Sequence, residues 1–317
     1  AIYPRDGATV DRLLRSADLA LRVSYDDPHT DAVFFDPLIR HRFEIRENAT
    51  DFLQSAVDEQ RILPFYQPIV RLSDGHVSGF EALVRVRLPD GSLSDPPQFW
   101  PALMDANMSR QVGFIMRDAV IRQMAAWRDR FGLTPDVSLN AAWSDLSNGG
   151  MHADLIGMLA VRNLAPGQLK IEVTENVMLS EPATSVDANL KSLRAQGVRI
   201  SLDDFGTGYG SLISLLSLPT DEVKIDRNFV GTVMERAASR AITGSIIELA
   251  AKMGITTVSE GIETAAQLAF VRERGSTHGQ GFLLGSPMPE GEAATLLQKG
   301  HVDLDAHSDL SPSAKGL

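Results

Sequence analysis

From residue 61 onward, short apolar runs alternate with longer stretches in which apolar residues recur at helical spacing. The strand candidates are PFYQPIV, VSGF, DVSLN, QLKIEV, VRISL, EVKI, TTVS and THGQGF. The predicted helices cover residues 97–107, 110–131, 151–162, 182–196, 211–217, 231–254, 264–273 and 290–299. Strands that alternate with helices indicate an α/β fold, and a single (β/α) barrel fits residues 61–300.

The first two strands depart from this alternation. PFYQPIVRL and HVSGFEALVRV are separated only by SDG, which is a hairpin turn signal. We therefore expect these two strands to pair in antiparallel fashion, unlike the strands that follow them.

The ends of the chain have a different character. Residues 9–23 form a short amphipathic pattern that is too small to bury a core of its own. Residues 34–60 read as a linker followed by a helix from about residue 37. Residues 301–317 are polar, and we expect them to be disordered.

Composition narrows the functional classes. The net charge is −11, which disfavours binding to DNA, RNA or an anionic membrane. The chain has no Cys, so disulfides, thiolate metal sites and Cys nucleophiles are excluded. No apolar run is long enough for a membrane span, and no signal peptide is evident. We expect a cytoplasmic domain that belongs to a longer protein, whose other parts can include a membrane anchor.

Polar and acidic residues follow or interrupt the predicted strands one after another. They are Glu81, Asn140, Glu172, Asp203, Asp204, Lys224, Glu260 and Gln280. In a (β/α) barrel the carboxyl ends of the strands converge on one face, which carries the active site. Taken singly, each residue is more simply a cap for the next helix. Together they predict a ring of oxygen ligands around one pocket.

Five carboxylates in one pocket would repel one another strongly unless cations lay between them. Oxygen ligands without Cys or His favour Mg²⁺ or Mn²⁺, and two such ions fit phosphoester hydrolysis. Asp203 and Asp204 are adjacent, so both can face one site only if the chain leaves regular strand geometry there. Gly206 and Gly208 would give the chain that freedom.

These segments resemble the EAL domain family of cyclic di-GMP phosphodiesterases. Glu81-Ala82-Leu83-Val84-Arg85 resembles the family signature, and six further motifs follow in family order. They are VSLN, KIEVTEN, SLDDFGTGYGSL, VKIDRNFV, VSEGIET and GQGF, and the resemblance covers about residues 45–298. It implies a modified TIM-like barrel with an antiparallel first strand, in agreement with the hairpin.

The resemblance also implies roles for individual residues. The implied metal ligands are Glu81, Asn140, Glu172, Asp203, Asp204 and Glu260. Lys224 would orient the attacking water or take part in proton transfer. Arg85, Leu83 and Gln280 would contact the nucleotide. Glu175 would hold the 204–212 loop in its active position.

The implied reaction is hydrolysis of cyclic di-GMP to linear pGpG by a water that two metal ions activate. Two alternatives remain open at this point, namely a receptor that binds the nucleotide without cutting it and a regulatory partner of a cyclase. The resemblance further implies a homodimer that forms through the barrel. AIYPRDG and LLRSADLAL resemble the end of a GGDEF domain, so we interpret residues 1–33 as the remnant of such a domain. The parent chain is then expected to carry GGDEF and sensor domains.

Overall fold

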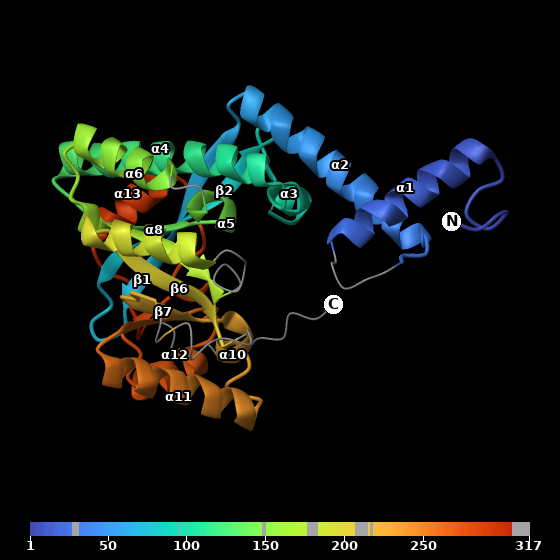
Figure 1. Ribbon diagram of the computed structural model, residues 1–317. Coiled ribbons are helices and arrows are strands. Elements are labelled where there is room, and N and C mark those ends of the chain that lie inside the picture. Colours follow the sequence, from blue (N-terminus) through green and yellow to red (C-terminus); the bar gives the residue numbers. More distant parts are fainter. Residues whose placement is uncertain are drawn as a thin grey trace. The chain divides into compact units, whose positions relative to one another are not determined.

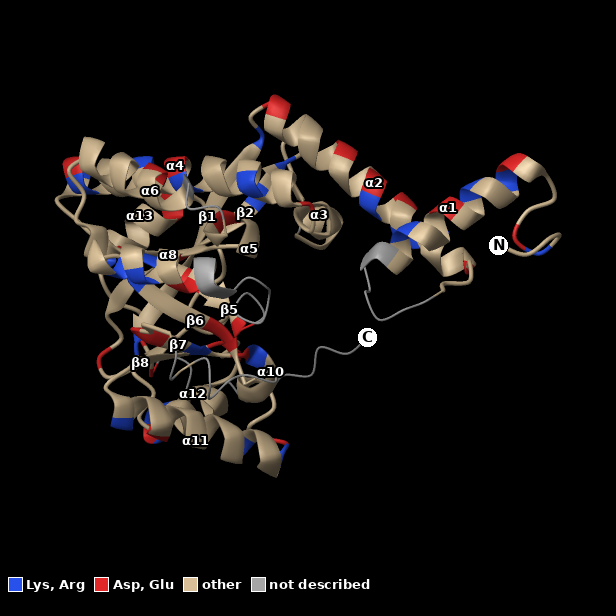
Figure 2. Cartoon of the chain, viewed as in Figure 1, with Lys and Arg blue, Asp and Glu red and all other residues tan. Residues whose placement is uncertain are grey.

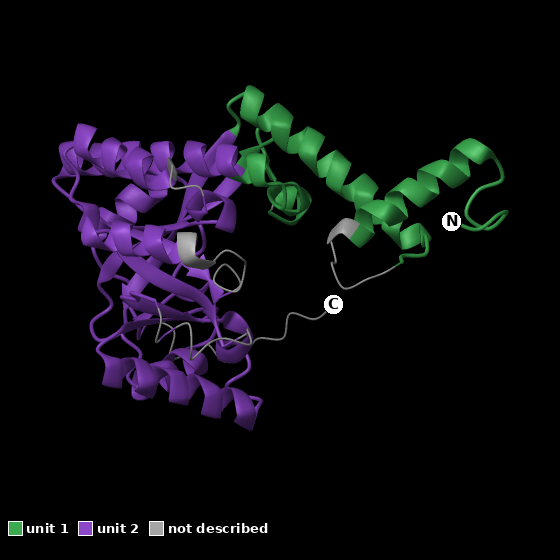
Figure 3. Cartoon of the chain, in the orientation of Figure 1, with its two compact units in different colours: residues 1–61, 86–109 green, residues 62–85, 110–317 purple. Residues whose placement is uncertain are grey.

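The computed structural model describes residues 1–26, 32–94, 96–147, 150–175, 183–206, 215 and 218–305. The chain folds into two compact units, which Figure 3 colours separately. Unit 1 comprises residues 1–61 and 86–109, and unit 2 comprises residues 62–85 and 110–317. The predicted helix over residues 211–217, Gly208, and residues 306–317 of the predicted tail lie outside the described residues.

Nine strands form one sheet, shown in Figure 1. They are β1 (Ile62–Arg71), β2 (Val77–Arg87), β3 (Leu93–Ser94), β4 (Asp136–Asn140), β5 (Leu169–Thr174), β6 (Arg199–Phe205), β7 (Glu222–Ile225), β8 (Thr256–Ser259) and β9 (His278–Gly279). The order is β1-β9-β8-β7-β6-β5-β4-β2-β3, and an additional β1–β2 pairing closes eight of the strands into a barrel.

The direction of the strands confirms the expected modified barrel. Strands β2, β4, β5, β6, β7, β8 and β9 run parallel from neighbour to neighbour. Only β1 is reversed within the closed ring, because it pairs antiparallel with β9. The turn between β1 and β2 contains Gly75, whose φ of 76° is the left-handed value that favours glycine.

Helices follow most of the strands, as the apolar periodicity predicts. Unit 2 contains most of α4 (Ala106–Phe131), with α5 (Trp143–Leu146), α6 (Gly150–Val161), the 3₁₀ turn η1 (Pro166–Gln168), α8 (Ala183–Ala195), α10 (Arg227–Val230), α11 (Ala237–Met253), α12 (Ala265–Glu273) and α13 (Glu290–Lys299). Helix α8 packs against β6, and α11 packs against β7 and β8. The strands are therefore covered by helices, and their apolar residues form the core.

Unit 1 contains α1 (Val10–Asp26), α2 (Pro37–Asp58) and α3 (Pro96–Leu103). Asp36 caps α2 by accepting a hydrogen bond from the backbone N–H of Leu38 at 2.8 Å. Helix α1 packs on α2, yet its apolar residues Leu14 and Leu21 are exposed.

The end of the barrel domain is tied to the first hairpin. His301 forms an antiparallel bridge with His76, and the N–H of Val302 donates to the carbonyl of Gly75 at 2.8 Å. The chain is thus held by the hairpin at least as far as Val302.

Gly261 is a position where the backbone of the barrel allows no side chain. Its φ is 67°, and a Cβ atom there would lie 2.6 Å from Cβ of Arg227. Gly254 has nearly the same φ of 69°, but a Cβ there would meet no atom within 4 Å. We expect Gly254→Ala to cost about 1–2 kcal/mol of unfolding free energy from left-handed strain alone. Gly261→Ala should cost distinctly more because of the added clash. Urea unfolding of both variants measures the difference, and equal costs would contradict the clash.

Candidate active site

The predicted acidic ring is present at one end of the barrel. Figure 2 shows acidic segments at the ends of β5 and β6. Strand β4 ends at Asn140, β8 ends one residue before Glu260, and Lys224 lies within β7. The carboxyl ends of the parallel strands therefore carry the polar residues of one site.

Glu81 and Glu172 do not end their strands. Strand β2 continues six residues beyond Glu81, and β5 continues to Thr174. Strand β2 is long because it pairs with β4 up to Ala82 and then pairs with β3 through Val86 and Arg87. Strand β2 thus continues beyond its pairing with β4, whereas Glu81 lies within that pairing, opposite Ser138.

Lys224 lies at the centre of the site. Its Nζ atom is 2.8 Å from Glu172 Oε2, 2.8 Å from Glu260 Oε1, 3.2 Å from Glu81 Oε2 and 3.2 Å from Asp203 Oδ1. Only 1% of the Lys224 side chain is exposed. An ammonium group has three N–H donors, so one lysine cannot satisfy four carboxylates at once.

Two amide side chains also contact Glu81. Asn140 Nδ2 donates to Glu81 Oε1 at 3.1 Å, and Gln280 Nε2 donates to Glu81 Oε2 at 2.7 Å. Gln280 Nε2 also lies 3.0 Å from Gln67 Oε1 on β1. Gln67 was not predicted, although a polar residue inside the apolar run PFYQPIV is a usable signal.

The barrel geometry explains how distant residues meet. Layers inside such a barrel take side chains from alternate strands. Strands β2, β5, β7 and β9 alternate around the ring and carry or directly precede one connected set, which is Glu81, Glu172, Lys224 and Gln280. Strands β4, β6 and β8 supply the others, which are Asn140, Asp203, Asp204 and Glu260.

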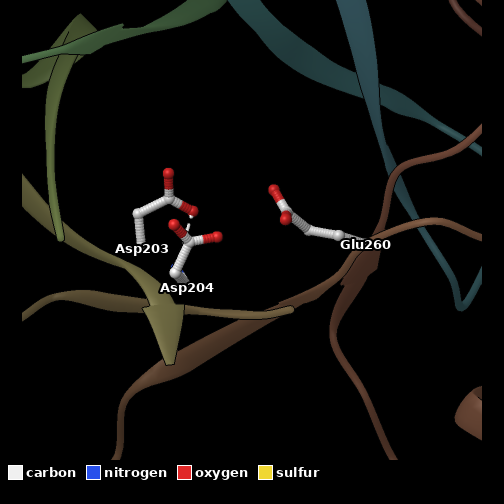
Figure 4. Close-up of side chains that lie close together, drawn as sticks. All are labelled: Asp203, Asp204 and Glu260. Atoms are coloured by element: carbon white, nitrogen blue, oxygen red, sulfur yellow. Dashed lines mark hydrogen bonds between the residues drawn. The ribbon is translucent and has the colours of Figure 1, made fainter. Parts of the chain in front are cut away.

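The Asp203–Asp204 pair leaves regular strand geometry, as predicted. The pairing of β6 with β7 shifts register between Leu202 and Phe205, and Asp204 has a left-handed φ of 54°. The backbone N–H of Asp204 donates to Asp203 Oδ1 at 3.0 Å. Figure 4 shows both aspartates facing Glu260 across the site. Carboxylate oxygens of these three residues all lie within 4.8 Å of one another, a spacing that could hold a metal ion.

Glu175, Leu83 and Arg85 also lie within the described residues. Glu175 Oε1 accepts a hydrogen bond from the N–H of Gly206 at 2.9 Å, so Glu175 holds the start of the 204–212 loop. Residues 207–212 of that loop lie outside the described residues. Leu83 and Arg85 follow Glu81 at intervals of two on β2, which places them on the same face of the strand. Arg85 also donates to the carbonyl of Val84 at 2.8 Å.

Burial and mutual repulsion set the ionisation of the cluster. Burial, followed by repulsion from Glu81, raises the pKa of Glu172 well above its usual value. Burial raises the pKa of Glu260 to about 8, with repulsion from Asp203 and Glu81 adding to burial against the attraction of Lys224. Burial and repulsion from Asp203 and from Asp226 raise the pKa of Asp204 to about 6. The metal-free cluster therefore holds protons that ordinary carboxyl groups would release.

Glu81 and Lys224 shift in the opposite sense. Burial alone would raise the pKa of Glu81, but Lys224 and the hydrogen bonds from Gln280 and Asn140 outweigh it and lower that pKa. Burial alone would lower the pKa of Lys224, yet the surrounding carboxylates raise it well above its usual value. Lys224 is therefore a permanent cation and not a proton acceptor at neutral pH.

The site also contains buried acceptors without a partner. Among the described residues, Glu172 Oε1 and Gln280 Oε1 are buried and accept no hydrogen bond. Together with the largely buried triad of Asp203, Asp204 and Glu260, they give a set of oxygen atoms suited to a hard divalent cation. The residues present therefore fit a bound metal.

Comparison with known proteins agrees with this geometry. The EAL domain pattern matches residues 51–287. The chain belongs to the EAL domain family. The resemblance that the EAL motifs indicate is thus confirmed, and the GGDEF remnant in residues 1–33 stays a prediction.

Two curated relatives come from Pseudomonas aeruginosa. The bifunctional diguanylate cyclase/cyclic di-GMP phosphodiesterase MucR is 34% identical over 289 residues, which are 91% of this chain and 42% of MucR. The cyclic di-GMP phosphodiesterase NbdA is 35% identical over 297 residues, which are 91% of this chain and 37% of NbdA. The chain thus spans less than half the length of these relatives.

Solved structures show the same fold. The PaMucR phosphodiesterase in complex with c-di-GMP has a TM-score of 0.72 and 34% identity, and the match covers 77% of this chain and 99% of that one. The EAL enzyme Bd1971 in its cAMP- and cyclic-di-GMP-bound form has a TM-score of 0.77 and 26% identity, and covers 91% of this chain and 75% of that one. In addition, none of the helices within the described ranges combines the length and apolar character needed to cross a membrane.

The raised pKa values predict how the stability of the metal-free protein depends on pH. Glu260 and Asp204 bind protons more tightly in the folded state than in the unfolded state, where their pKa values are near 4.5 and 3.8. Folding therefore takes up protons between about pH 4 and pH 8, and stability must fall as the pH rises through that window. In chelator, we expect the melting temperature to fall from pH 5 to pH 8. Mg²⁺ should raise it more at pH 8 than at pH 5, because its ligands must be deprotonated.

Glu260→Gln provides the control for this experiment, since it removes the carboxyl group whose pKa burial raises to about 8. The variant should show a flatter pH dependence in chelator than the wild type. A melting temperature that rises from pH 5 to pH 8 without metal would contradict the assignment.

Proposed function

We propose that this domain hydrolyses cyclic di-GMP to linear pGpG in a reaction that requires Mg²⁺ or Mn²⁺. The observation that carries the proposal is the convergence of five carboxylates and Asn140 around Lys224 at the strand ends of an EAL barrel. Support comes from relatives that are named cyclic di-GMP phosphodiesterases. The reversed first strand and the intact motif residues also favour it.

Charge balance favours two divalent ions. Five ionised carboxylates and one lysine leave a charge of −5 + 1 = −4 in the cluster, which two divalent ions would cancel. Glu81, Asn140, Glu172 and Asp203 would hold one ion. Asp203, Asp204 and Glu260 would hold a second ion. Such ions lower the pKa of a water that attacks phosphorus and neutralise charge on the phosphate.

Other side chains of the site would bind the nucleotide and assist the reaction. Arg85 would pair with a phosphate of the nucleotide, and Leu83 and Gln280 would line the substrate position. In hydrolysis, the oxygen of water joins phosphorus, one P–O bond of the ring breaks, and the departing sugar oxygen takes a proton. Lys224 keeps its proton at neutral pH, so it would donate a hydrogen bond to the water or to the departing oxygen, not remove a proton.

The parts of the chain beyond the site stay predictions. They include the homodimer, the GGDEF remnant in residues 1–33 and the role of Glu175 in holding the 204–212 loop in its active position. Glu175 has one carboxylate oxygen on the N–H of Gly206, which is consistent with the loop role.

The first test is direct. Purified protein incubated with cyclic di-GMP and Mn²⁺ or Mg²⁺ should yield linear pGpG by chromatography, and chelator should stop the reaction. Glu81→Gln keeps the shape of the side chain but loses a ligand and the partner of Lys224. It should lose turnover by at least about 10²-fold while its circular dichroism stays native. Tight nucleotide binding by the wild type with no product would favour a receptor in place of an enzyme.

Lys224→Met separates catalysis from charge balance. If Lys224 takes part in the reaction, turnover should fall by about 10²-fold or more and stay low at saturating Mn²⁺, while nucleotide still binds. Because the variant removes an ammonium that lies on the ligand oxygens, its Mn²⁺ affinity by calorimetry should not fall. Full recovery of turnover at high Mn²⁺ would reduce Lys224 to a counter-ion.

A further inference from the structure

A second charged pair lies inside the barrel, below the site. Lys170 Nζ donates to Glu222 Oε2 at 2.8 Å and to Glu222 Oε1 at 3.0 Å. Ser201 on β6, which lies between β5 and β7, donates to Glu222 Oε1 at 3.1 Å. The Lys170 and Glu222 side chains are only 6% and 4% exposed. This pair belongs to neither the acidic ring nor the predicted site residues.

The Lys170–Glu222 pair repeats the Glu172–Lys224 pair of the site, with the positive and negative charges exchanged between β5 and β7. Lys170 precedes Glu172 by two residues on β5, and Glu222 precedes Lys224 by two residues on β7. Residues two apart on a strand face the same side, about 7 Å apart along it. Strand β5 therefore carries a cation below an anion, and β7 carries an anion below a cation.

If nothing held Lys170 in place, its ammonium group could compete with a metal ion for the Glu172 carboxylate. Glu172 Oε1 is a buried acceptor without a hydrogen-bond partner in the described part of the chain. It lies on the same face of the same strand as the Lys170 ammonium, which is long and flexible enough to turn toward it. Lys170 Nζ instead donates to both carboxylate oxygens of Glu222, and His278 interacts electrostatically with both members of the pair.

We propose that Glu222 is a positioning residue that holds Lys170 in the lower layer, and so leaves Glu172 available to a divalent cation and to Lys224. The inference rests on the proposed function, because it assigns Glu172 to a metal. It adds a requirement that the motif residues do not contain, namely a buried carboxylate that keeps a second ammonium away from the ligands.

Packing alone does not require this pair. Replacing a buried ion pair by apolar residues of similar volume is often neutral or stabilising, whereas removing one partner leaves an uncompensated charge. The two cases give different predictions for metal binding. A merely structural pair would make Glu222→Gln harmful through folding, and loss of Lys170 in addition would not restore the metal site.

The test compares Glu222→Gln with the double variant Lys170→Met/Glu222→Gln, using Mn²⁺ binding by calorimetry and metal-free crystal structures. Glu222→Gln should bind Mn²⁺ at least about tenfold more weakly than the wild type, because Lys170 is freed to neutralise Glu172. In its metal-free structure, Lys170 Nζ should lie within hydrogen-bond distance of Glu172. The double variant has no freed ammonium, and its affinity should return to within about threefold of the wild type. Glu222→Asp keeps the charge and should retain most of the affinity.

Two results would overturn the proposal: wild-type Mn²⁺ affinity in Glu222→Gln, or a double variant as weak as Glu222→Gln. If Glu222→Gln does not fold, Ser201→Ala removes one hydrogen bond to Glu222 and should weaken Mn²⁺ binding about two- to threefold, with recovery on adding Lys170→Met. A wild type that binds no Mn²⁺ would refute the proposed metal site. The position of Lys170 in metal-free crystals would still decide the positioning role.

Discussion

The site depends on one electrostatic constraint: a single buried ammonium faces more carboxylates than it can satisfy. Nζ of Lys224 lies within 3.2 Å of four carboxylate oxygens, and the fifth acid, Asp204, sits beside Asp203. Burial, reinforced by the excess of negative charge, raises the pKa values of Glu172, Glu260 and Asp204. In the metal-free protein, some of these carboxyl groups therefore keep their protons, while others are ionised without enough hydrogen-bond donors. Divalent cations would neutralise the same excess of charge without protons, so we expect folding, protonation and metal binding to be linked in this barrel.

Barrel geometry makes that concentration of charge achievable. Parallel strands bring residues far apart in sequence to one height, and alternate strands fill one layer. Glu81 and Lys224 are 143 residues apart, yet they meet because β2 and β7 carry them to the same layer. On the opposite faces of β5 and β7, the apolar residues Ile171 and Val223 are completely buried. The strand pairing and this apolar core hold the backbone while the acidic side chains repel one another, so the fold tolerates a site that is itself unfavourable without metal.

Sequence reasoning found the acids because their signal is local. A carboxylate beside a buried strand is visible without any structure, and the adjacent Asp203 and Asp204 required an irregular backbone, which the left-handed Asp204 supplies. The same reasoning placed Glu81 and Glu172 at strand ends, although β2 and β5 continue past them. Strand length depends on which neighbour remains to pair, as β3 does for β2. That information is long-range, and no local pattern contains it.

The residues that sequence reasoning missed share another property. Gln67 lies on the reversed strand, Lys170 is the first residue of the motif KIEVTEN, and Glu222 directly precedes the motif VKIDRNFV. Each has a role defined by a partner on a different strand, and its own neighbours in sequence do not identify that partner. Lys170 reads as an ordinary polar position inside the run QLKIEV, and Glu222 reads as the polar first residue of the run EVKI. The register aligns both Glu172 and Glu222 with Ser201, and only the hydrogen bonds from Lys170 Nζ to both Glu222 carboxylate oxygens show that the two charges meet across β6.

A barrel interior that carries charge in two layers needs its cations fixed as firmly as its anions, because either lysine can neutralise the same glutamate. Lys224 is fixed by the acids of the site, whereas Lys170 is fixed by Glu222 in the layer below. Control of the site therefore extends below the residues that contact a metal, to the carboxylate that decides where the second lysine stays.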